Sequence, residues 1–205
     1  MVRTRDSIRI AVDALAAREP AFARVIDQFG VPEPRRSERG AQTLLRTIVG
    51  QQVSVAAARA MWTKLEAAFG SPPDLTSLLN ASDEDLRAAG MSRQKSGYIQ
   101  SLAQLVISGE LDLEALPQDN EEAIELLTKI KGIGRWSAEI YLLFAEGRPD
   151  VWPAGDLAVQ IEIGRLLGLP DKPSEKHLRE VAEAWRPYRG AAAVLAWHSY
   201  NSSVL

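Results

Sequence analysis

Apolar residues recur every three or four positions along most of the chain, which is the spacing of one buried face of an α-helix. No run of alternating apolar and polar residues indicates a β-strand, and the β-branched residues fall within the helical pattern. We therefore predict an all-α fold of about ten helices joined by short loops. The pattern places these helices near residues 8–15, 22–29, 44–49, 54–69, 81–90, 93–109, 120–132, 136–146, 156–168, 174–184 and 188–200.

Several predicted helices carry the residues typical of helix ends. Gly70 follows the helix at 54–69, and a glycine just beyond a helix is a common stop. Ser82 is a predicted N-cap with Asp85 three residues later, and Gly90 ends the same helix.

The segment KIKGIGRWSAEI, residues 129–140, has two glycines one residue apart between two predicted helices. In one interpretation Gly132 is a left-handed cap of the first helix and Gly134 allows a tight approach of the chain. In the other, the N–H groups from Gly134 to Ser137 bind a phosphate oxygen at the positive end of the second helix. A dinucleotide-binding loop is excluded because a helix, rather than a strand, precedes the glycines.

Asp156 opens the predicted helix at 156–168, after a break at Pro153 and Gly155. Aspartate is a favoured N-cap, so a purely structural role is one interpretation. The helix dipole also keeps a carboxylate at this position ionised, which suits a group that faces developing positive charge. The two roles are compatible.

Composition removes several classes of protein. The 205-residue chain has no cysteine and two histidines, which excludes a disulfide framework, a thiolate zinc site and a cysteine nucleophile. No apolar stretch approaches the roughly 20 residues of a membrane span, and no secretory signal is recognisable, so we expect a cytoplasmic protein. The net charge of −3 counts against a broad basic face for nucleic acid. It does not count against binding by a few oriented backbone amides, which carry no formal charge.

Four segments of the chain resemble sequence motifs of one known protein family, and they follow one another in the same order as in that family. They are LLTKIKGIGRWSAEIYLLFAEGRPDVWPAGDLAVQ (126–160), LLRTIVGQQVSVAAARAMWTKL (44–65), GMSRQKSGYIQSLA (90–103) and WRPYRGAAAVLAWHSY (185–200). These segments resemble four motifs of the helix-hairpin-helix DNA glycosylase superfamily. Residues 126–160 resemble its hairpin with the following loop and aspartate, and residues 44–65 its Gln-containing helix–loop–helix. Residues 90–103 resemble its Gly-x-Ser-x-x-Lys segment, and residues 185–200 its C-terminal Trp-x-Pro motif. The branch they resemble is 3-methyladenine DNA glycosylase II, and the resemblance covers residues 40–200.

The resemblance implies that the protein flips an alkylated purine, of the 3-methyladenine type, out of double-stranded DNA and hydrolyses its N-glycosidic bond. Asp156 would stabilise the oxocarbenium-like sugar and orient a water molecule. Trp136 and Trp197 would form an electron-rich pocket for the cationic base, with Tyr141 and Trp152 as further lining. Core packing is the alternative for the tryptophans.

The resemblance also implies how the duplex is held. Gln52 would fill the gap left by the flipped base, with Gln51 beside it; the alternative is a polar loop that satisfies backbone groups. Lys129, Lys131 and Arg135 add positive charge near the hairpin. The residues expected to contact the phosphate backbone are Gly132, Ile133, Gly134, Arg135 and Ser137.

Trp136 stands where lyase-type relatives carry an amine nucleophile, so a monofunctional hydrolase is expected. No cofactor is required, although the superfamily implies a Na⁺ or K⁺ ion on the backbone carbonyls of Thr128, Ile130 and Ile133. The chain departs from the better-known members in one pocket position, where Ile140 replaces a tyrosine.

The implied architecture has two helical subdomains with a DNA-binding cleft between them. Residues 41–146 would form the central subdomain with the hairpin, and residues 1–40 plus 147–205 the second. The N-terminal segment is too short for the β domain of longer members, so its two helices should pack beside the C-terminal ones. We expect a monomer that acts on the bacterial chromosome without a membrane partner.

Two other classes of function stay open from the sequence. One is a non-catalytic helix-hairpin-helix DNA-binding protein, and the other is an unrelated helical interaction protein, which the acidic pI favours. The enzyme is favoured because a pure binder needs neither Asp156, 24 positions after Gly132 (156 − 132), nor the two distant tryptophans.

Overall fold

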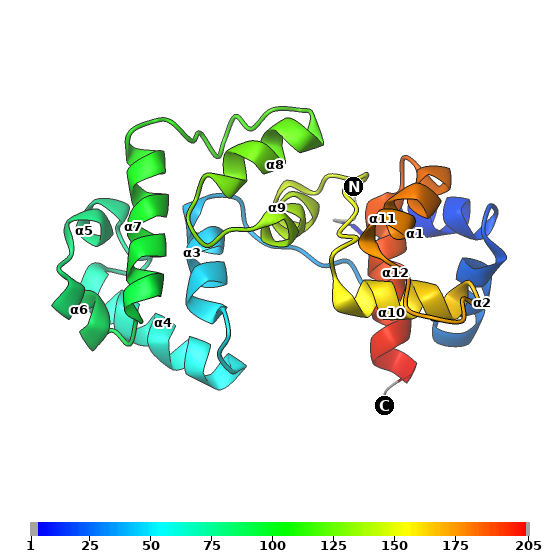
Figure 1. The fold of residues 1–205 in the computed structure, drawn as a ribbon, viewed down its shortest axis with the longest axis horizontal. Coiled ribbons are helices and arrows are strands. Elements are labelled where there is room, and N and C mark those ends of the chain that lie inside the picture. Colours follow the sequence, from blue (N-terminus) through cyan, green and yellow to red (C-terminus); the bar gives the residue numbers. More distant parts are fainter. Residues whose placement is uncertain (1–3, 204–205) are drawn as a thin grey trace. The chain divides into compact units, whose positions relative to one another are not determined.

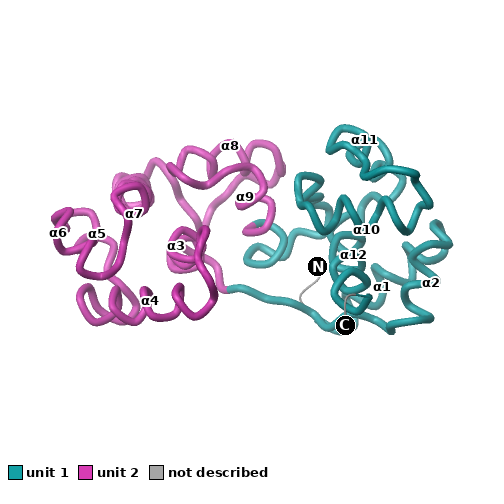
Figure 2. Tube along the Cα trace, turned by 60° about the horizontal axis from the view of Figure 1, so that its bottom comes forward, with its two compact units in different colours: residues 1–37, 142–205 teal, residues 38–141 magenta. Residues whose placement is uncertain are grey.

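The computed structural model describes residues 4–203, and every regular element in that part of the chain is a helix (Figure 1). The all-α prediction is thereby confirmed. The chain forms two compact units, residues 1–37 with 142–205 as unit 1 and residues 38–141 as unit 2 (Figure 2). The sequence had suggested divisions at 40/41 and 146/147. No helix over residues 4–203 has the length and apolar character that a bilayer span needs.

Unit 2 is built around two helices that pack on one another, α3 and α7. Their facing apolar residues are fully buried, among them Leu45 and Ile48 of α3 and Leu102 of α7. Helices α5 and α6 pack on α7, and α8 packs on α9. The elements of this unit are α3 (Ala41–Gly50), α4 (Val55–Phe69), α5 (Leu75–Asn80), α6 (Asp83–Ala88), α7 (Arg93–Ile107), α8 (Asn120–Thr128) and α9 (Arg135–Tyr141).

Unit 1 is organised around the C-terminal helix α12, which contacts α1, α2 and α10. The first two helices therefore pack beside the C-terminal ones, as expected. Phe22 of α2 meets Trp185 edge to face with ring centroids 5.0 Å apart, and Trp185 meets Trp152 in the same way at 5.4 Å. The elements are α1 (Arg5–Ala16), α2 (Pro20–Phe29), the π-helix Leu142–Glu146, α10 (Leu157–Leu166), α11 (Glu175–Val181), the 3₁₀ helix Ala182–Trp185 and α12 (Arg189–Ser203).

Several predicted helix ends agree with the structure, with two additions and one difference. The helix expected to end at Gly132 ends at Thr128, and its C-cap is Lys129 instead of Gly132. Ser82 and Asp85 form a reciprocal capping box, in which the Ser82 hydroxyl accepts the Asp85 N–H at 3.1 Å. The sequence reading did not include α5, whose N-cap Asp74 accepts the Ser77 N–H at 2.7 Å. The helix expected at 136–146 is α-helical to Tyr141 and then continues as a π-helix.

The two glycines between α8 and α9 have different structural requirements. Gly132 has φ = 82°, and a Cβ on it would lie 2.1 Å from Cδ2 of the Tyr98 ring. A Cβ on Gly134 would meet no atom within 4 Å over residues 4–203, apart from those of Gly134 itself and its two chain neighbours. The tight approach that we expected at Gly134 is therefore made by Gly132, and the backbone at Gly134 faces open space.

Gly132→Ala should destabilise the protein strongly, whereas Gly134→Ala should not. A left-handed backbone costs a residue with a Cβ about 1–2 kcal/mol, and overpacking against Tyr98 adds about 1–3 kcal/mol. Urea unfolding of both variants beside the wild type measures this difference. Equal stabilities for the two variants would contradict the packing described here.

Candidate functional site

The Asp156 carboxylate is held by two N–H donors from different helices of unit 1. As N-cap of α10 it accepts the backbone N–H of Val159 on Oδ1 at 3.0 Å. The indole Nε1–H of Trp197, in α12, donates to the same oxygen at 3.0 Å. The side chain is half-buried. Asp156 is thus the N-cap of α10, and its carboxylate still lies partly exposed beside the Trp197 ring.

The loop that precedes Asp156 is fixed by polar side chains. The buried amide of Gln160 donates to the Ala154 carbonyl at 2.8 Å, and Lys172 Nζ donates to the amide oxygen of Gln160 at 2.7 Å. The Trp152 indole donates to the Leu178 carbonyl at 3.1 Å. Sequence reasoning did not identify Gln160. The available signal was a polar residue one turn after Asp156, in the apolar first half of the helix.

The four aromatic residues predicted to line a base pocket divide into two groups. Trp197 is half-buried, with its ring 5.7 Å from that of Phe144, and Trp136 in unit 2 is 46% exposed. Tyr141 and Trp152 are each only 3% exposed. The Tyr141 hydroxyl accepts the Gly40 N–H at 2.8 Å. Tyr141 and Trp152 therefore belong to the packed interior of units 2 and 1 respectively, and a place in the lining of a base pocket stays a prediction for both.

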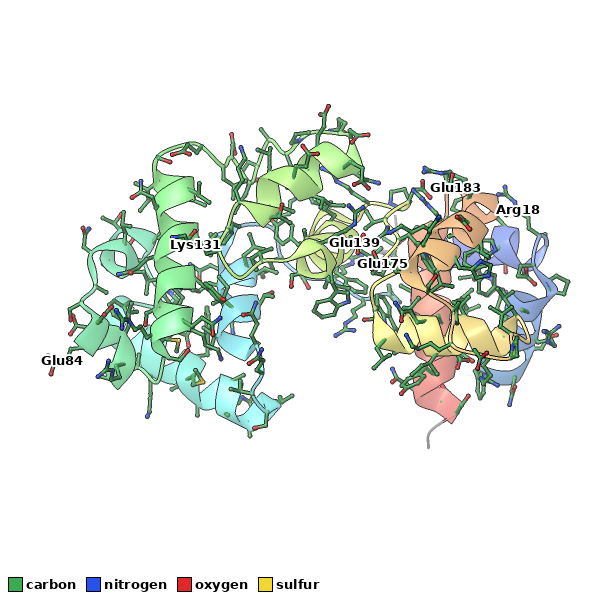
Figure 3. The ribbon with its side chains drawn as sticks, viewed as in Figure 1. Arg18, Glu84, Lys131, Glu139, Glu175 and Glu183 are labelled. Carbon is green, nitrogen blue, oxygen red and sulfur yellow. The ribbon has the colours of Figure 1, made fainter. Side chains whose placement is uncertain are left out.

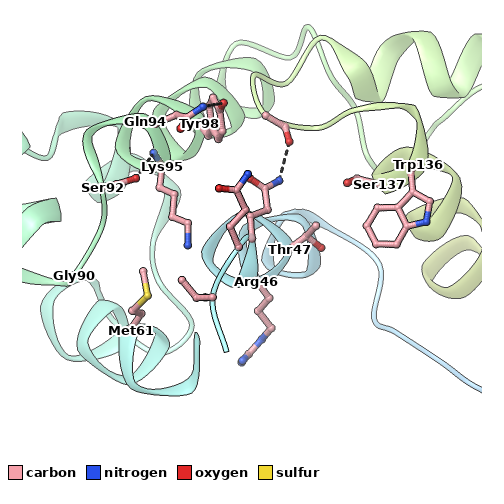
Figure 4. A pocket seen from close by; sticks show the side chains of 15 residues that line it. Arg46, Thr47, Met61, Gly90, Ser92, Gln94, Lys95, Tyr98, Trp136 and Ser137 are labelled. Carbon is pink, nitrogen blue, oxygen red and sulfur yellow. Dashed lines mark hydrogen bonds between the residues drawn. The ribbon is translucent and has the colours of Figure 1, made fainter. Parts of the chain in front are cut away.

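Unit 2 contains a cavity of about 880 Å³ beside the predicted wedge loop (Figure 4). Its lining carries two cationic side chains, Arg46 and Lys95, and no carboxylate, although the chain as a whole is acidic. The cavity brings together five of the residues singled out from the sequence, namely Gln51, Gln52, Gly132, Trp136 and Ser137.

The two glutamines of the loop have separate roles. The Gln51 amide Nε2 donates to the Gly132 carbonyl at 2.8 Å, the bond drawn as a dashed line in Figure 4. Gln51 therefore ties the loop to the hairpin. Gln52 is exposed, and it is the one non-glycine residue with positive φ (55°) over residues 4–203. Of the two glutamines, only Gln52 has an exposed side chain that can project from the protein surface.

Arg135 is engaged within the protein. Its guanidinium pairs with Glu121 at 2.7 Å and with the buried Glu139 at 3.0 Å, and hydrogen bonding to Glu121 raises its pKa. The expectation that Arg135 adds positive charge for a phosphate is therefore corrected, because two carboxylates compensate that charge. Lys131 is exposed on the hairpin (Figure 3).

Backbone amides remain at the start of α9. The Ala138 N–H donates to the Gly134 carbonyl at 3.0 Å, and the N–H groups before it have no acceptor within the helix. Ile133 is buried and anchors this turn, with its N–H bound to the Ile130 carbonyl at 3.0 Å. Across residues 4–203 there is no cluster of three or more metal-binding side chains, so any cation here would depend on carbonyl oxygens.

Comparison with known families agrees with this arrangement. The protein-family model described as "HhH-GPD superfamily base excision DNA repair protein" matches residues 45–187. The chain belongs to this superfamily. The predicted superfamily and branch are confirmed, since its relatives include several proteins named DNA-3-methyladenine glycosylase.

Individual relatives of this HhH-GPD protein cover most of its length. "DNA-3-methyladenine glycosylase 1" of Schizosaccharomyces pombe is 33% identical over 93% of this chain and 86% of its own. The structure of the 3-methyladenine DNA glycosylase of the same yeast with abasic DNA aligns with a TM-score of 0.79 at 32% identity, over 95% of this chain and 97% of that one. A DNA-3-methyladenine glycosidase from Bacillus halodurans aligns with a TM-score of 0.86 at 33% identity, over 95% and 90%.

Asp156→Asn should leave the HhH-GPD fold intact, because asparagine and aspartate are equally good N-caps. We expect its free energy of unfolding within about 0.5 kcal/mol of the wild type, and a loss of about 1 kcal/mol for Asp156→Ala. Urea unfolding monitored by circular dichroism measures both. A large loss in the asparagine variant would mean that the charge itself holds the site together.

Proposed function

We propose that this protein is a monofunctional DNA glycosylase that releases N-alkylated purines, of the 3-methyladenine type, from double-stranded DNA. The observation that carries the proposal is the half-buried Asp156 carboxylate, oriented by the Val159 N–H and the Trp197 indole. The sequence predicted this activity, and the names of the relatives agree with it.

The chemistry needs one carboxylate. An N-alkylated purine already carries positive charge, so it leaves with the electrons of the glycosidic bond without a general acid. The sugar then carries oxocarbenium character, which the Asp156 carboxylate stabilises, and water adds at C1′ to give an abasic site. The Trp197 N–H donates to Oδ1, and this hydrogen bond fixes the orientation of the carboxylate.

Exposed aromatic surface suits a cationic base. Trp136 presents nearly half its surface to solvent, and an aromatic face attracts a cation by about 0.5–2 kcal/mol. Unit 2 supplies the grip on the duplex through the N–H groups in the first turn of α9 and through exposed Lys129 and Lys131. Gln52 is the residue proposed to fill the space of the flipped base.

Purified protein incubated with dimethyl-sulfate-treated duplex should release free 3-methyladenine and leave abasic sites that break only on treatment with alkali. Asp156→Asn should lower the release rate by at least about 100-fold, because it removes the charge that stabilises the sugar. Its affinity for DNA should be unchanged. Chromatography of the released bases and a gel-shift titration measure the two quantities.

Trp197→Phe is the matched variant for the hydrogen bond. It keeps an aromatic ring but removes the N–H that orients Asp156, so release should slow by about tenfold. Release by Asp156→Asn at the wild-type rate would exclude the proposed mechanism. DNA binding without any release by the wild type would instead favour the non-catalytic helix-hairpin-helix protein.

We also propose a monovalent cation, Na⁺ or K⁺, on the hairpin carbonyls of Thr128, Ile130 and Ile133. The carbonyl of Ile130 accepts one backbone hydrogen bond, from Ile133, which leaves it a second lone pair for a cation. Oxygen ligands of this kind suit hard cations. The ion would stiffen the turn that presents the N–H groups.

Replacing sodium and potassium with tetramethylammonium at equal ionic strength should weaken DNA binding if this ion supports the hairpin, because the larger cation cannot enter a ring of carbonyls. Gel-shift titrations in the three salts measure the affinity. Equal affinity in all three would exclude a role for the ion.

A further inference from the structure

Lys95 is a buried cation that the proposed reaction does not use. It lies in α7, the residue is 9% exposed, and its side chain lines the cavity of unit 2 (Figure 4). Burial lowers the pKa of its ammonium group. Over residues 4–203 no carboxylate pairs with Nζ, and its partner is the backbone carbonyl of Val49, at 2.7 Å. A buried charge with a single neutral partner is costly, so it requires a physical reason.

The Val49 carbonyl is at the end of α3, where a helix leaves its last four carbonyls without intrahelical partners. Helix α3 lacks the left-handed glycine that usually follows such an end, because Gln51 at the C-cap is extended with ψ = 131°. A lysine side chain can take the place of that cap by donating to one of the last carbonyls. Lys95 does so from a different helix.

The loop after α3 is very short and is held at three points. Lys95 binds its start through Val49, and the Gln51 amide binds the Gly132 carbonyl of the hairpin. At its end, Ser54 is the N-cap of α4 and accepts the Ala57 N–H at 3.2 Å. Gln52 lies between these points with φ = 55°, a conformation that persists only where the surroundings enforce it.

We propose that Lys95 is a positioning residue for Gln52. Its ammonium group holds the end of α3 through the Val49 carbonyl and thereby maintains the left-handed backbone from which the Gln52 side chain enters the duplex. This inference rests on the proposed function, since it assumes that Gln52 fills the space of a flipped base. The lysine of the Gly-x-Ser-x-x-Lys segment thereby has a role in base extrusion, although this lysine does not contact the DNA itself.

A phosphate ligand is the other role that a lysine in this cavity could have. The exposed Lys129 represents that role, because it lies near the hairpin and its charge is free to meet a phosphate. The two roles give different kinetics. A phosphate ligand contributes to affinity and to its salt dependence, whereas a positioning residue contributes to the rate of release once the DNA is bound.

The test is single-turnover release of 3-methyladenine from dimethyl-sulfate-treated duplex with enzyme in saturating excess, together with the dissociation constant at several salt concentrations. Lys95→Met should slow release at saturation by about tenfold and leave the dissociation constant within about twofold. Lys95→Arg, which can still donate to Val49, should recover most of the rate. Lys129→Met, with the same change of charge, should instead weaken binding and flatten its salt dependence.

Gln51→Met removes the second attachment of the loop, and it keeps the proposal testable if Lys95→Met does not fold. It should show the same pattern, and the double variant should be little slower than the slower single variant, because both act on one loop conformation. A loss confined to affinity, or wild-type release by both single variants, would overturn the role of Lys95. Absence of release by the wild type would instead overturn the proposed function.

Discussion

The structure of the site depends on one oxygen atom, Oδ1 of Asp156, which accepts two N–H groups. The Val159 N–H comes from the first turn of α10 and the Trp197 N–H from α12, so one carboxylate joins the two helices that pack most closely in unit 1. Capping and chemistry do not compete here, because a cap needs an oxygen acceptor at the helix N-terminus and the proposed chemistry uses the charge of the same carboxylate. A residue that is essential for local structure can therefore also face a substrate.

The surface of unit 2 is organised on a different physical basis. Glu121 and Glu139 compensate the charge of Arg135, and the hairpin turn is fixed by Gly132 against the Tyr98 ring. What this region offers a phosphate is mainly the dipole of the first turn of α9, with few free charges. An acidic protein can bind a polyanion in this way because the contact is made by main-chain groups at a few places.

Much of this could be predicted from the sequence, and the rest fails for identifiable reasons. Helical periodicity and capping residues located nearly all the helices, because these signals are local. The burial of Tyr141 and Trp152 could not be predicted, because burial depends on neighbours distant in sequence, such as Gly40 and Leu178. The Gly-x-Ser-x-x-Lys segment marks Lys95, but its acceptor, the Val49 carbonyl, lies 46 residues away in the sequence, and no local pattern indicates that contact.

The distribution of tryptophans has a spectroscopic consequence. Trp62, Trp152 and Trp185 are buried, whereas Trp136 is largely exposed and Trp197 is half-buried beside the carboxylate. A soluble quencher such as acrylamide would thus reach mainly Trp136 and Trp197. Stacking of a flipped base on either ring would alter its fluorescence, so the protein contains an intrinsic optical reporter of base extrusion that needs no attached dye.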